Sequence, residues 1–384
     1  MTPLSLQLAG AEVLRADGLS DQSVVLDGGK IVSEADAPVV DLSGYRIFPG
    51  IVDAHGDAFE RHVAPRRGAM KTIAGGIRAA EAEIAANGIT TAVMAQFYSW
   101  EGGLRGPEFA AEFFSALKSV RAEIITDLRP QMRLETHLVD VFERLPEQLA
   151  EWGIAYVVFN DHLPHDRLAE GRKPPRMTGQ ALKAGLNPDV YFQKLLDLHA
   201  LGPQVPPALQ SLCEKLRAQS ITLGSHDDTD TATRAVWRGR GAVISEFPET
   251  QEAAEAARAG GDSIILGAPN VVRGGSHKGK VSALDLIIMG LCDALVSDYH
   301  YPSLRAAAAF LVRSGICDLA TAWGLISDGP ARMLGLNDRG RIEAGYRADL
   351  VILDKKDNRV AATISGGRVS YLSGEIANRF VAAR

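Results

Sequence analysis

The chain has 384 residues, of which 46% are hydrophobic and 23% are charged, and its formal net charge at pH 7 is −6. This size allows one large core with a small appended domain, and the charge provides no overall positive field for binding nucleic acid or an anionic membrane surface. The three cysteines form no CxxC pair, which argues against a disulfide framework and a thiolate zinc site. Because the chain lacks a signal-peptide pattern and an uncharged apolar stretch of about 18 residues, we expect a cytoplasmic protein without a membrane span.

The two ends of the chain predict short antiparallel strands. In the first 48 residues, apolar runs such as 4–8 and 23–26 are separated by turn residues. The same pattern returns after about residue 340. We therefore predict a small β-sandwich domain assembled from residues 1–48 and 340–384, with a second domain over residues 49–339.

Between these ends, apolar β-like runs alternate with longer helical patterns, which is typical of a parallel α/β fold. Eight strands are predicted, over residues 47–54, 90–96, 132–138, 155–160, 221–225, 242–246, 263–267 and 294–297. Helical patterns such as 77–86, 108–122 and 304–313 fill the gaps. The gap at about 163–220 is unusually long, and we interpret it as a lid or an insertion. Eight alternations of this kind predict a (β/α)8 barrel, also called a TIM barrel.

Polar side chains recur where the predicted strands end, which is where barrel enzymes assemble their active sites. They are Asp53, His55, Asp57, Glu135, His137, His162, His226, Glu246 and Asp298. Residues i and i+2 of a strand face the same side, so His55 and Asp57 could chelate one ion together. An HxD pair alone is more often the polar start of a loop. Imidazole and carboxylate groups at several strand ends, however, match the ligands of Zn²⁺ or Mn²⁺.

The segment FPGIVDAH at residues 48–55 resembles the signature of the amidohydrolase superfamily. The resemblance implies a distorted (β/α)8 barrel with a small β-sandwich made from both chain ends. It also implies a divalent transition metal, with two ions expected, and Zn²⁺ ahead of Mn²⁺, Ni²⁺ or Fe²⁺. The implied ligands are His55, Asp57, Glu135, His162, His226 and Asp298. The family usually has HxH on the first strand where this chain has HxD, and on the third strand His137 is an alternative to Glu135.

Longer segments resemble the α-D-ribose 1-methylphosphonate 5-triphosphate diphosphatases of phosphonate catabolism. They are HGDAFERHVAPR at 55–66, SHDDT at 225–229, EFP at 246–248, APNVVRGGSH at 268–277 and SDY at 297–299. The run at 268–277 is the most specific of them. The resemblance implies a diphosphatase that cleaves the α–β phosphoanhydride of a ribose 5-triphosphate and releases pyrophosphate. The segment DHLPHDR at 161–167 departs from the family, because glycine and glutamine are expected where His165 and Asp166 stand.

A triphosphate carries about four negative charges, so a carboxylate-lined site needs metal ions and several cations to hold it. The substrate-binding candidates are Glu60, His62, Arg66, Arg273, His277 and Lys278. The glycines at 274 and 275 would let backbone N–H groups approach an anion closely. Basic residues within 165–176 are further candidates. The predicted partner is a small anionic phosphorylated molecule, and a homo-oligomer stays possible because the sequence does not indicate the number of subunits.

The expected reaction is a two-metal hydrolysis in which Asp298 is the catalytic base that orients a water for in-line attack at the α-phosphorus. Two alternatives stay open. The metal ligands alone do not determine which substrate binds, so the same scaffold would suit a cyclic-amide or N-acetyl amino-sugar amidohydrolase. A non-catalytic scaffold on the same barrel is the second alternative, but it predicts missing metal ligands, whereas the set in this sequence is intact.

Overall fold

The computed structural model describes residues 2–64, 72–274 and 281–383. The chain divides into two compact units. Unit 1 comprises Met1–Met94, Val120–Arg129 and Ile265–Arg384, and unit 2 comprises Ala95–Ser119 and Pro130–Ile264. In the described ranges, no helix is both long and apolar enough to cross a membrane.

Eight parallel strands form the predicted barrel, and they follow one another around the sheet in sequence order. They are β8 (Ile51–Gly56), β9 (Ile89–Tyr98), β10 (Asp127–Glu135), β11 (Tyr156–Asn160), β12 (Thr222–His226), β13 (Ile244–Glu246), β14 (Ser263–Gly267) and β15 (Ala294–Val296). An isolated bridge between Gly56 and Asp298 brings the last strand back to the first. All residues of β8 and β9 are buried, as expected for parallel strands that are covered on both faces. The predicted (β/α)8 barrel is therefore confirmed.

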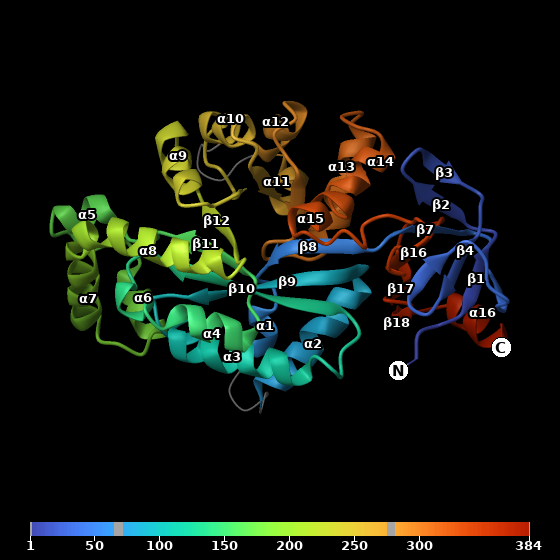
Figure 1. The fold of residues 1–384 in the computed structure, drawn as a ribbon, viewed down its shortest axis with the longest axis horizontal. Coiled ribbons are helices and arrows are strands. Elements are labelled where there is room, and N and C mark those ends of the chain that lie inside the picture. The colour runs from blue at the N-terminus through green and yellow to red at the C-terminus, as the bar shows by residue number, and fades with distance from the viewer. Residues whose placement is uncertain (1, 65–71, 275–280, 384) are drawn as a thin grey trace. The chain divides into compact units, whose positions relative to one another are not determined.

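The small β-rich part of unit 1 is built from both chain ends, as predicted. One sheet has the order β5 (Lys30–Val32), β4 (Val24–Asp27), β1 (Leu6–Ala9) and β6 (Val39–Asp41). The other has the order β18 (Arg368–Leu372), β17 (Val360–Ser365), β16 (Leu350–Asp354), β7 (Tyr45–Pro49), β2 (Glu12–Arg15) and β3 (Gly18–Ser20). Leu8 and Ile47 share one buried core with Ile352 and Ile364. The two ends of the chain lie beside these sheets (Figure 1).

Helices connect the barrel strands, and several begin at a capping side chain. Unit 1 contains α1 (Glu60–Val63), α2 (Ile73–Ala86), α11 (Ala268–Arg273), α12 (Ala283–Ile288), α13 (Ser303–Arg313), α14 (Leu319–Gly324), α15 (Asp328–Met333) and α16 (Ile376–Ala382). The side chains of Thr72 and Asp318 accept hydrogen bonds from the first turns of α2 and α14. Such caps satisfy backbone N–H groups that have no partner within the helix.

The helices of unit 2 include those of the long segment 163–220. They are α3 (Pro107–Val120, whose last residue belongs to unit 1), α4 (Leu145–Trp152), α5 (His165–Ala169), α6 (Met177–Lys183), α7 (Pro188–Ala200), α8 (Val205–Ala218), α9 (Thr231–Gly239) and α10 (Gln251–Ala259), with 3-10 turns η1 (Gly103–Arg105), η2 (Val139–Val141) and η3 (Gly202–Gln204). Figure 1 shows α5 to α8 gathered at one end of this unit. Leu209, Leu212 and Leu216 are buried on one face of α8, so the segment is a packed helical insertion.

Candidate active site

In unit 1, backbone hydrogen bonds hold the end of β8 beside Asp298, two residues beyond β15. The N–H of Asp57 donates to the carbonyl of Asp298 at 2.9 Å, and the N–H of Asp298 donates to the carbonyl of His55 at 3.1 Å. The side chain of His55 is fully buried, whereas Asp57 and Asp298 are partly exposed. Three of the predicted metal ligands thus come from adjoining strand ends.

A left-handed backbone follows three of the barrel strands. Asp227, Phe247 and Asp298 have φ values of 59°, 54° and 54°, and none of them is glycine. This conformation costs an L-residue about 1–2 kcal/mol, and such residues persist mainly where the surrounding structure enforces them, often at functional sites. Asp227 follows His226, and Asp298 is the predicted base, so the strain falls on candidate site residues.

A buried carboxylate that the sequence did not assign a role lies beside these residues. Asp53 accepts a hydrogen bond from the backbone N–H of Ser297 at 3.0 Å and another from its hydroxyl at 2.6 Å. Burial raises the pKa of Asp53 to about 6, although both hydrogen bonds act in the opposite direction. Asp53 precedes His55 by two residues on β8, so strand alternation could have indicated that it shares the face of a predicted ligand.

In unit 2, two predicted ligands contact each other directly. The fully buried carboxylate of Glu135, at the end of β10, has its Oε1 2.5 Å from Nδ1 of His162. Its Oε2 accepts hydrogen bonds from the backbone N–H of His162 at 3.2 Å and from Nε1 of Trp100 at 3.1 Å. Burial alone would lower the pKa of His162, but the hydrogen bond and charge of Glu135 outweigh burial and raise it. Glu135 is therefore firmly oriented toward His162.

His226 ends β12 and lies close to His162. The ligand atoms offered by His162, His226 and Asp227 all lie within 4.8 Å of one another. Burial lowers the pKa of His226, which favours the neutral imidazole that binds metals. Two imidazole nitrogens and a carboxylate oxygen are a donor set that suits a divalent transition metal, so the residues present fit the implied ion.

Two further residues flank His226: Arg133, which the sequence prediction did not name, and Glu246, which it placed at a strand end without a role. Glu246 Oε2 lies 3.4 Å from Nδ1 of His226, and Arg133 Nη2 lies 3.3 Å from its Nε2. The other oxygen of Glu246 accepts hydrogen bonds from Gln131 at 2.9 Å and from the Tyr156 hydroxyl at 2.7 Å. Such contacts fix the ring orientation of a metal-binding histidine. Arg133 precedes Glu135 by two residues on β10, which was the available sequence signal.

The loop after His226 is fixed by a buried ion pair. Asp228 accepts hydrogen bonds from Ser225 at 2.7 Å, from Ser245 at 2.9 Å and from Arg234 at 3.1 Å. The side chains of Asp228 and Arg234 are both fully buried. The sequence leaves the role of Asp228 open. In the structure its carboxylate joins Arg234 to the hydroxyls of Ser225 and Ser245, the residues that precede His226 and Glu246.

The predicted substrate-binding residues are placed in part. Glu60 and His62 belong to α1, and Nε2 of His62 lies 2.6 Å from Glu83 on α2. Arg273 is exposed at the end of α11, with its guanidinium carbon 5.4 Å from the centre of the Tyr299 ring. The remaining candidates, Arg66, His277 and Lys278, lie outside the described residues.

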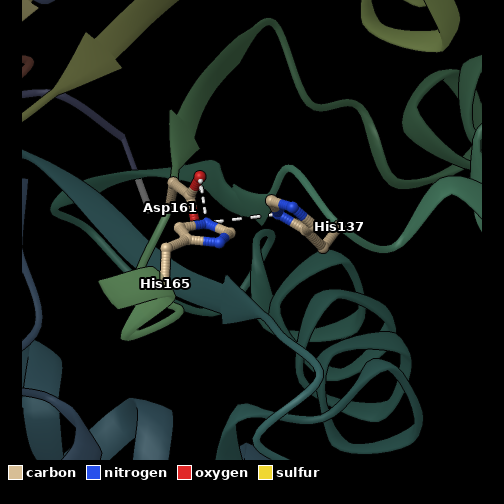
Figure 2. A group of neighbouring side chains, drawn as sticks. All are labelled: His137, Asp161 and His165. Atoms are coloured by element: carbon tan, nitrogen blue, oxygen red, sulfur yellow. Dashed lines mark hydrogen bonds and ion pairs between the residues drawn. The ribbon is translucent and has the colours of Figure 1, made fainter. Parts of the chain in front are cut away.

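A second group of side chains in unit 2 contains His137, the alternative to Glu135 in the sequence prediction. His137 shares a group of candidate ligand atoms with Asp161 and His165 rather than with His162 and His226. Its Nδ1 lies 3.7 Å from Oδ1 of Asp161, which also contacts His165 (Figure 2). A cavity of about 600 Å³ is lined by this group and by His226.

Comparisons with known proteins identify the family. A model described as the amidohydrolase family matches residues 300–371. The alpha-D-ribose 1-methylphosphonate 5-triphosphate diphosphatase of Escherichia coli (strain K12) is 35% identical over 334 residues, which cover 84% of this chain and 86% of that protein. The chain belongs to the amidohydrolase superfamily. An imidazolonepropionase of Deinococcus radiodurans is 26% identical to this amidohydrolase over 411 residues, covering 93% of this chain and 92% of that protein.

Solved structures agree with the fold of this amidohydrolase. A Xaa-Pro dipeptidase has a TM-score of 0.63 at 14% identity, covering 96% of this chain and 100% of that chain. The N-acetylglucosamine-6-phosphate deacetylase of Pasteurella multocida has a TM-score of 0.64 at 11% identity, covering 95% and 99%. At these identities the likeness concerns the fold alone. The superfamily expected from the sequence is confirmed, and the chain is a hydrolase.

Proposed function

We propose that this amidohydrolase is a metal-dependent diphosphatase that cleaves the α–β phosphoanhydride of α-D-ribose 1-methylphosphonate 5-triphosphate and releases pyrophosphate. The substrate rests on the 35% identity to the diphosphatase of E. coli over 84% of the chain. The metal dependence rests on one observation, the convergence of donor atoms from His162, His226 and Asp227 within 4.8 Å. These two lines of support are independent of each other.

Each unit contains one group of residues that would bind a divalent ion, with zinc proposed first and manganese, nickel or iron as alternatives. In unit 2 they are His162, His226, Asp227 and Glu135, and in unit 1 they are His55, Asp57 and Asp298. When bound, a divalent ion would polarise a phosphoryl oxygen and lower the pKa of water. Two ions remain our proposal, because a triphosphate demands several positive charges.

Asp298 is proposed to accept the proton of the attacking water. Its carboxylate is partly exposed, and the hydrogen bonds between its backbone and residues 55 and 57 fix where the side chain begins. A base must lie within hydrogen-bond reach of the proton that it removes, and a fixed backbone limits the positions that the carboxylate can take. In unit 2, Glu246 would hold the ring of His226 in one orientation, because Gln131 and Tyr156 fix the other oxygen of that carboxylate.

Arg273 is proposed to bind the phosphate chain. It is exposed and lies against Tyr299, the residue that follows the proposed base. A guanidinium can make two parallel hydrogen bonds to a phosphate, which gives both charge neutralisation and orientation. Arg66, His277 and Lys278 remain sequence-based candidates for the same task.

A product assay tests the proposal. The purified chain, loaded separately with Zn²⁺, Mn²⁺, Ni²⁺ or Fe²⁺, is incubated with the ribose 5-triphosphate, and pyrophosphate and orthophosphate are measured. Stoichiometric pyrophosphate supports the proposal, and orthophosphate as the first product contradicts the site of attack. His226→Ala and Asp298→Ala controls identify activity that comes from a contaminating phosphatase.

Hydrolysis of a cyclic amide is a second candidate, favoured by the 26% identity to imidazolonepropionase over 93% of the chain. The two candidates differ in their need for cations, because an amide carries no charge comparable to that of a triphosphate. Turnover of a cyclic amide by the same metal-loaded protein, with no release of pyrophosphate from the triphosphate, would favour the second candidate.

A further inference from the structure

Three side chains of unit 2 meet just beyond two neighbouring barrel strands. His137 follows β10, Asp161 follows β11, and His165 is the first residue of α5. Strands β10 and β11 pair in parallel with Glu135 opposite Asn160, so the residues that follow them leave the sheet at the same edge. The short loop between β11 and α5 returns His165 to the Asp161 carboxylate.

The carboxylate of Asp161 contacts two imidazole rings (Figure 2). Its oxygens are 3.2 and 3.1 Å from Nε2 of His165, and its Oδ1 is 3.7 Å from Nδ1 of His137. The ring centres of the two histidines are 4.9 Å apart. One ligand atom from each of the three residues lies within 4.8 Å of the other two.

We propose that His137, Asp161 and His165 form a further binding site for a divalent transition metal, separate from the group of His162, His226 and Asp227. Two imidazole nitrogens and one carboxylate oxygen are ligands that Zn²⁺ accepts, and three protein ligands leave a position for water. The two groups share no residue.

His199 supplies the supporting contact that a metal-binding histidine needs. Nδ1 of His165 lies 2.8 Å from Nδ1 of His199 on α7, so one nitrogen of this pair must carry the hydrogen. When His165 donates this hydrogen to His199, its Nε2 presents a lone pair toward the Asp161 carboxylate. A cation between two such electron-rich atoms removes their repulsion. Histidine ligands of metals regularly donate their second N–H in this way, which fixes the tautomer and the ring orientation.

The three residues are accessible to a small ion, and a bound ion would connect several segments of the chain. His137 is almost fully buried, but the side chains of Asp161 and His165 are 41% and 38% exposed. All three residues line the cavity of about 600 Å³. A bound ion would join the loops after β10 and β11 to α5, and His199 would extend this connection to α7. We therefore infer that the metal anchors the start of the helical insertion 163–220.

Metal counting on the full chain tests the proposal. The metal-free wild-type protein, His165→Ala and the matched control Asp166→Asn are dialysed against Zn²⁺, and bound zinc is measured by mass spectrometry. Asp166 is the exposed neighbour of His165 on the same helix and is outside the cluster. We expect His165→Ala to bind one equivalent of zinc fewer than the wild type, and Asp166→Asn to bind the wild-type amount. Equal zinc contents in all three proteins would overturn the proposal and leave a hydrogen-bonded cluster without a metal.

A second pair of variants separates this site from the proposed catalytic metal. His226→Ala should lack the zinc bound by His162, His226 and Asp227, which His165→Ala retains. The double variant should lack the zinc of both groups. If His226→Ala binds as much zinc as the wild type, the proposal of a catalytic metal at His226 is wrong. A lower zinc content of His165→Ala would still support the further site. Asp161→Asn repeats the test without a change in side-chain volume, and circular dichroism verifies that each variant is folded. Cobalt substitution adds a direct readout, because the visible absorption of one Co²⁺ should disappear in His165→Ala and remain in Asp166→Asn.

Discussion

Asp53 and Ser297 are joined by two hydrogen bonds, at 3.0 Å from the serine backbone and at 2.6 Å from its hydroxyl. Asp53 belongs to the first barrel strand and Ser297 directly follows the last. The pair thus links the two strands at which the barrel closes, next to His55 and Asp298. The pair leaves no space for a side chain at Gly56, because a Cβ there would lie 2.8 Å from Oδ2 of Asp53 and 2.9 Å from Oγ of Ser297.

We expect Gly56→Ala to destabilise the protein by about 1–3 kcal/mol, the usual cost of overpacking a filled interior. The new methyl group must displace one member of the Asp53–Ser297 pair, and both members are fully buried. The free energy of unfolding in urea measures the effect. Gly179→Ala is the control, since Gly179 lies inside α6 with nothing within 4 Å of an added Cβ. Equal stabilities of the two variants would contradict the prediction.

The ionisation of Asp53 predicts a dependence of stability on pH. Its pKa is about 6 in the folded protein against an ordinary value of 3.8, so between these pH values the folded state keeps a proton that the unfolded state releases. Stability from this group is therefore present at low pH and is lost as the pH rises through about 6. The loss is on the order of 3 kcal/mol when ionisation is complete.

Asp53→Asn tests this dependence, because asparagine does not ionise. Both proteins are freed of metal with a chelator, and their free energies of unfolding in urea are measured at pH 4.5 and pH 7.5. The free energy of unfolding of the variant minus that of the wild type should be larger at pH 7.5 than at pH 4.5. A difference that is the same at both pH values would mean that Asp53 is not held neutral by its burial.

Glu246→Gln should weaken metal binding or activity about 10- to 100-fold, the usual effect of removing a carboxylate that orients a metal-binding histidine. Glutamine retains the size of the side chain but removes the charge that faces Nδ1 of His226 at 3.4 Å. Equilibrium dialysis with Zn²⁺ and the steady-state rate measure the effect. Glu255→Gln serves as control, because Glu255 is exposed on α10 and bonds only to Gln251 among the contacts described. A Glu246→Gln protein with unchanged zinc affinity and rate would exclude this orienting role.

Much of the fold could be predicted from the sequence, because parallel barrel strands that are buried on both faces are continuous apolar runs. The third strand shows where this signal ends. It was predicted over 132–138 but spans Asp127–Glu135, since its first half alternates polar and apolar residues. The strand ends earlier than predicted because the chain turns after Glu135, where the N–H of Leu138 donates to the carbonyl of Glu135 at 3.2 Å. The polar first half of the strand carries no apolar run that the prediction could use.

The site was predicted less completely than the fold. The ligand candidates could be named because histidines and acids stand at strand ends, which is a local pattern. The contacts of Arg133 and Glu246 with His226 join residues 93 and 20 positions apart, and the link between Asp53 and Ser297 spans 244 positions. No local pattern encodes such pairs, because barrel closure and strand register bring them together. The same reason explains why His137 and His165 were not grouped.

Charge reversal at Arg273 tests the phosphate-binding role. If Arg273 binds the triphosphate, Arg273→Glu should raise KM about 10- to 100-fold, since a hydrogen bond between charged groups contributes about 1.5–3 kcal/mol. Arg313→Glu is a matched control, because Arg313 is also an exposed arginine at the end of a helix of unit 1. Pyrophosphate release should be unchanged in the control. Unaltered turnover of the triphosphate by Arg273→Glu would show that this residue does not bind the phosphate chain.

Removal of Arg234 should destabilise the chain by about 3–5 kcal/mol, because it leaves the buried carboxylate of Asp228 without its cation. Arg234 is fully buried and forms ion pairs with Asp228 and Asp262, both at 3.1 Å. Arg332→Ala provides the comparison: its side chain is 62% exposed and pairs with Asp328 four residues earlier, so we expect a loss below about 1 kcal/mol. Unfolding in urea measures both values. Because Asp228 also accepts a hydrogen bond from Ser225, the residue before His226, Arg234→Ala should lower zinc affinity at temperatures where the protein remains folded. A stable Arg234→Ala protein with normal zinc affinity would show that the buried pair does not support the site.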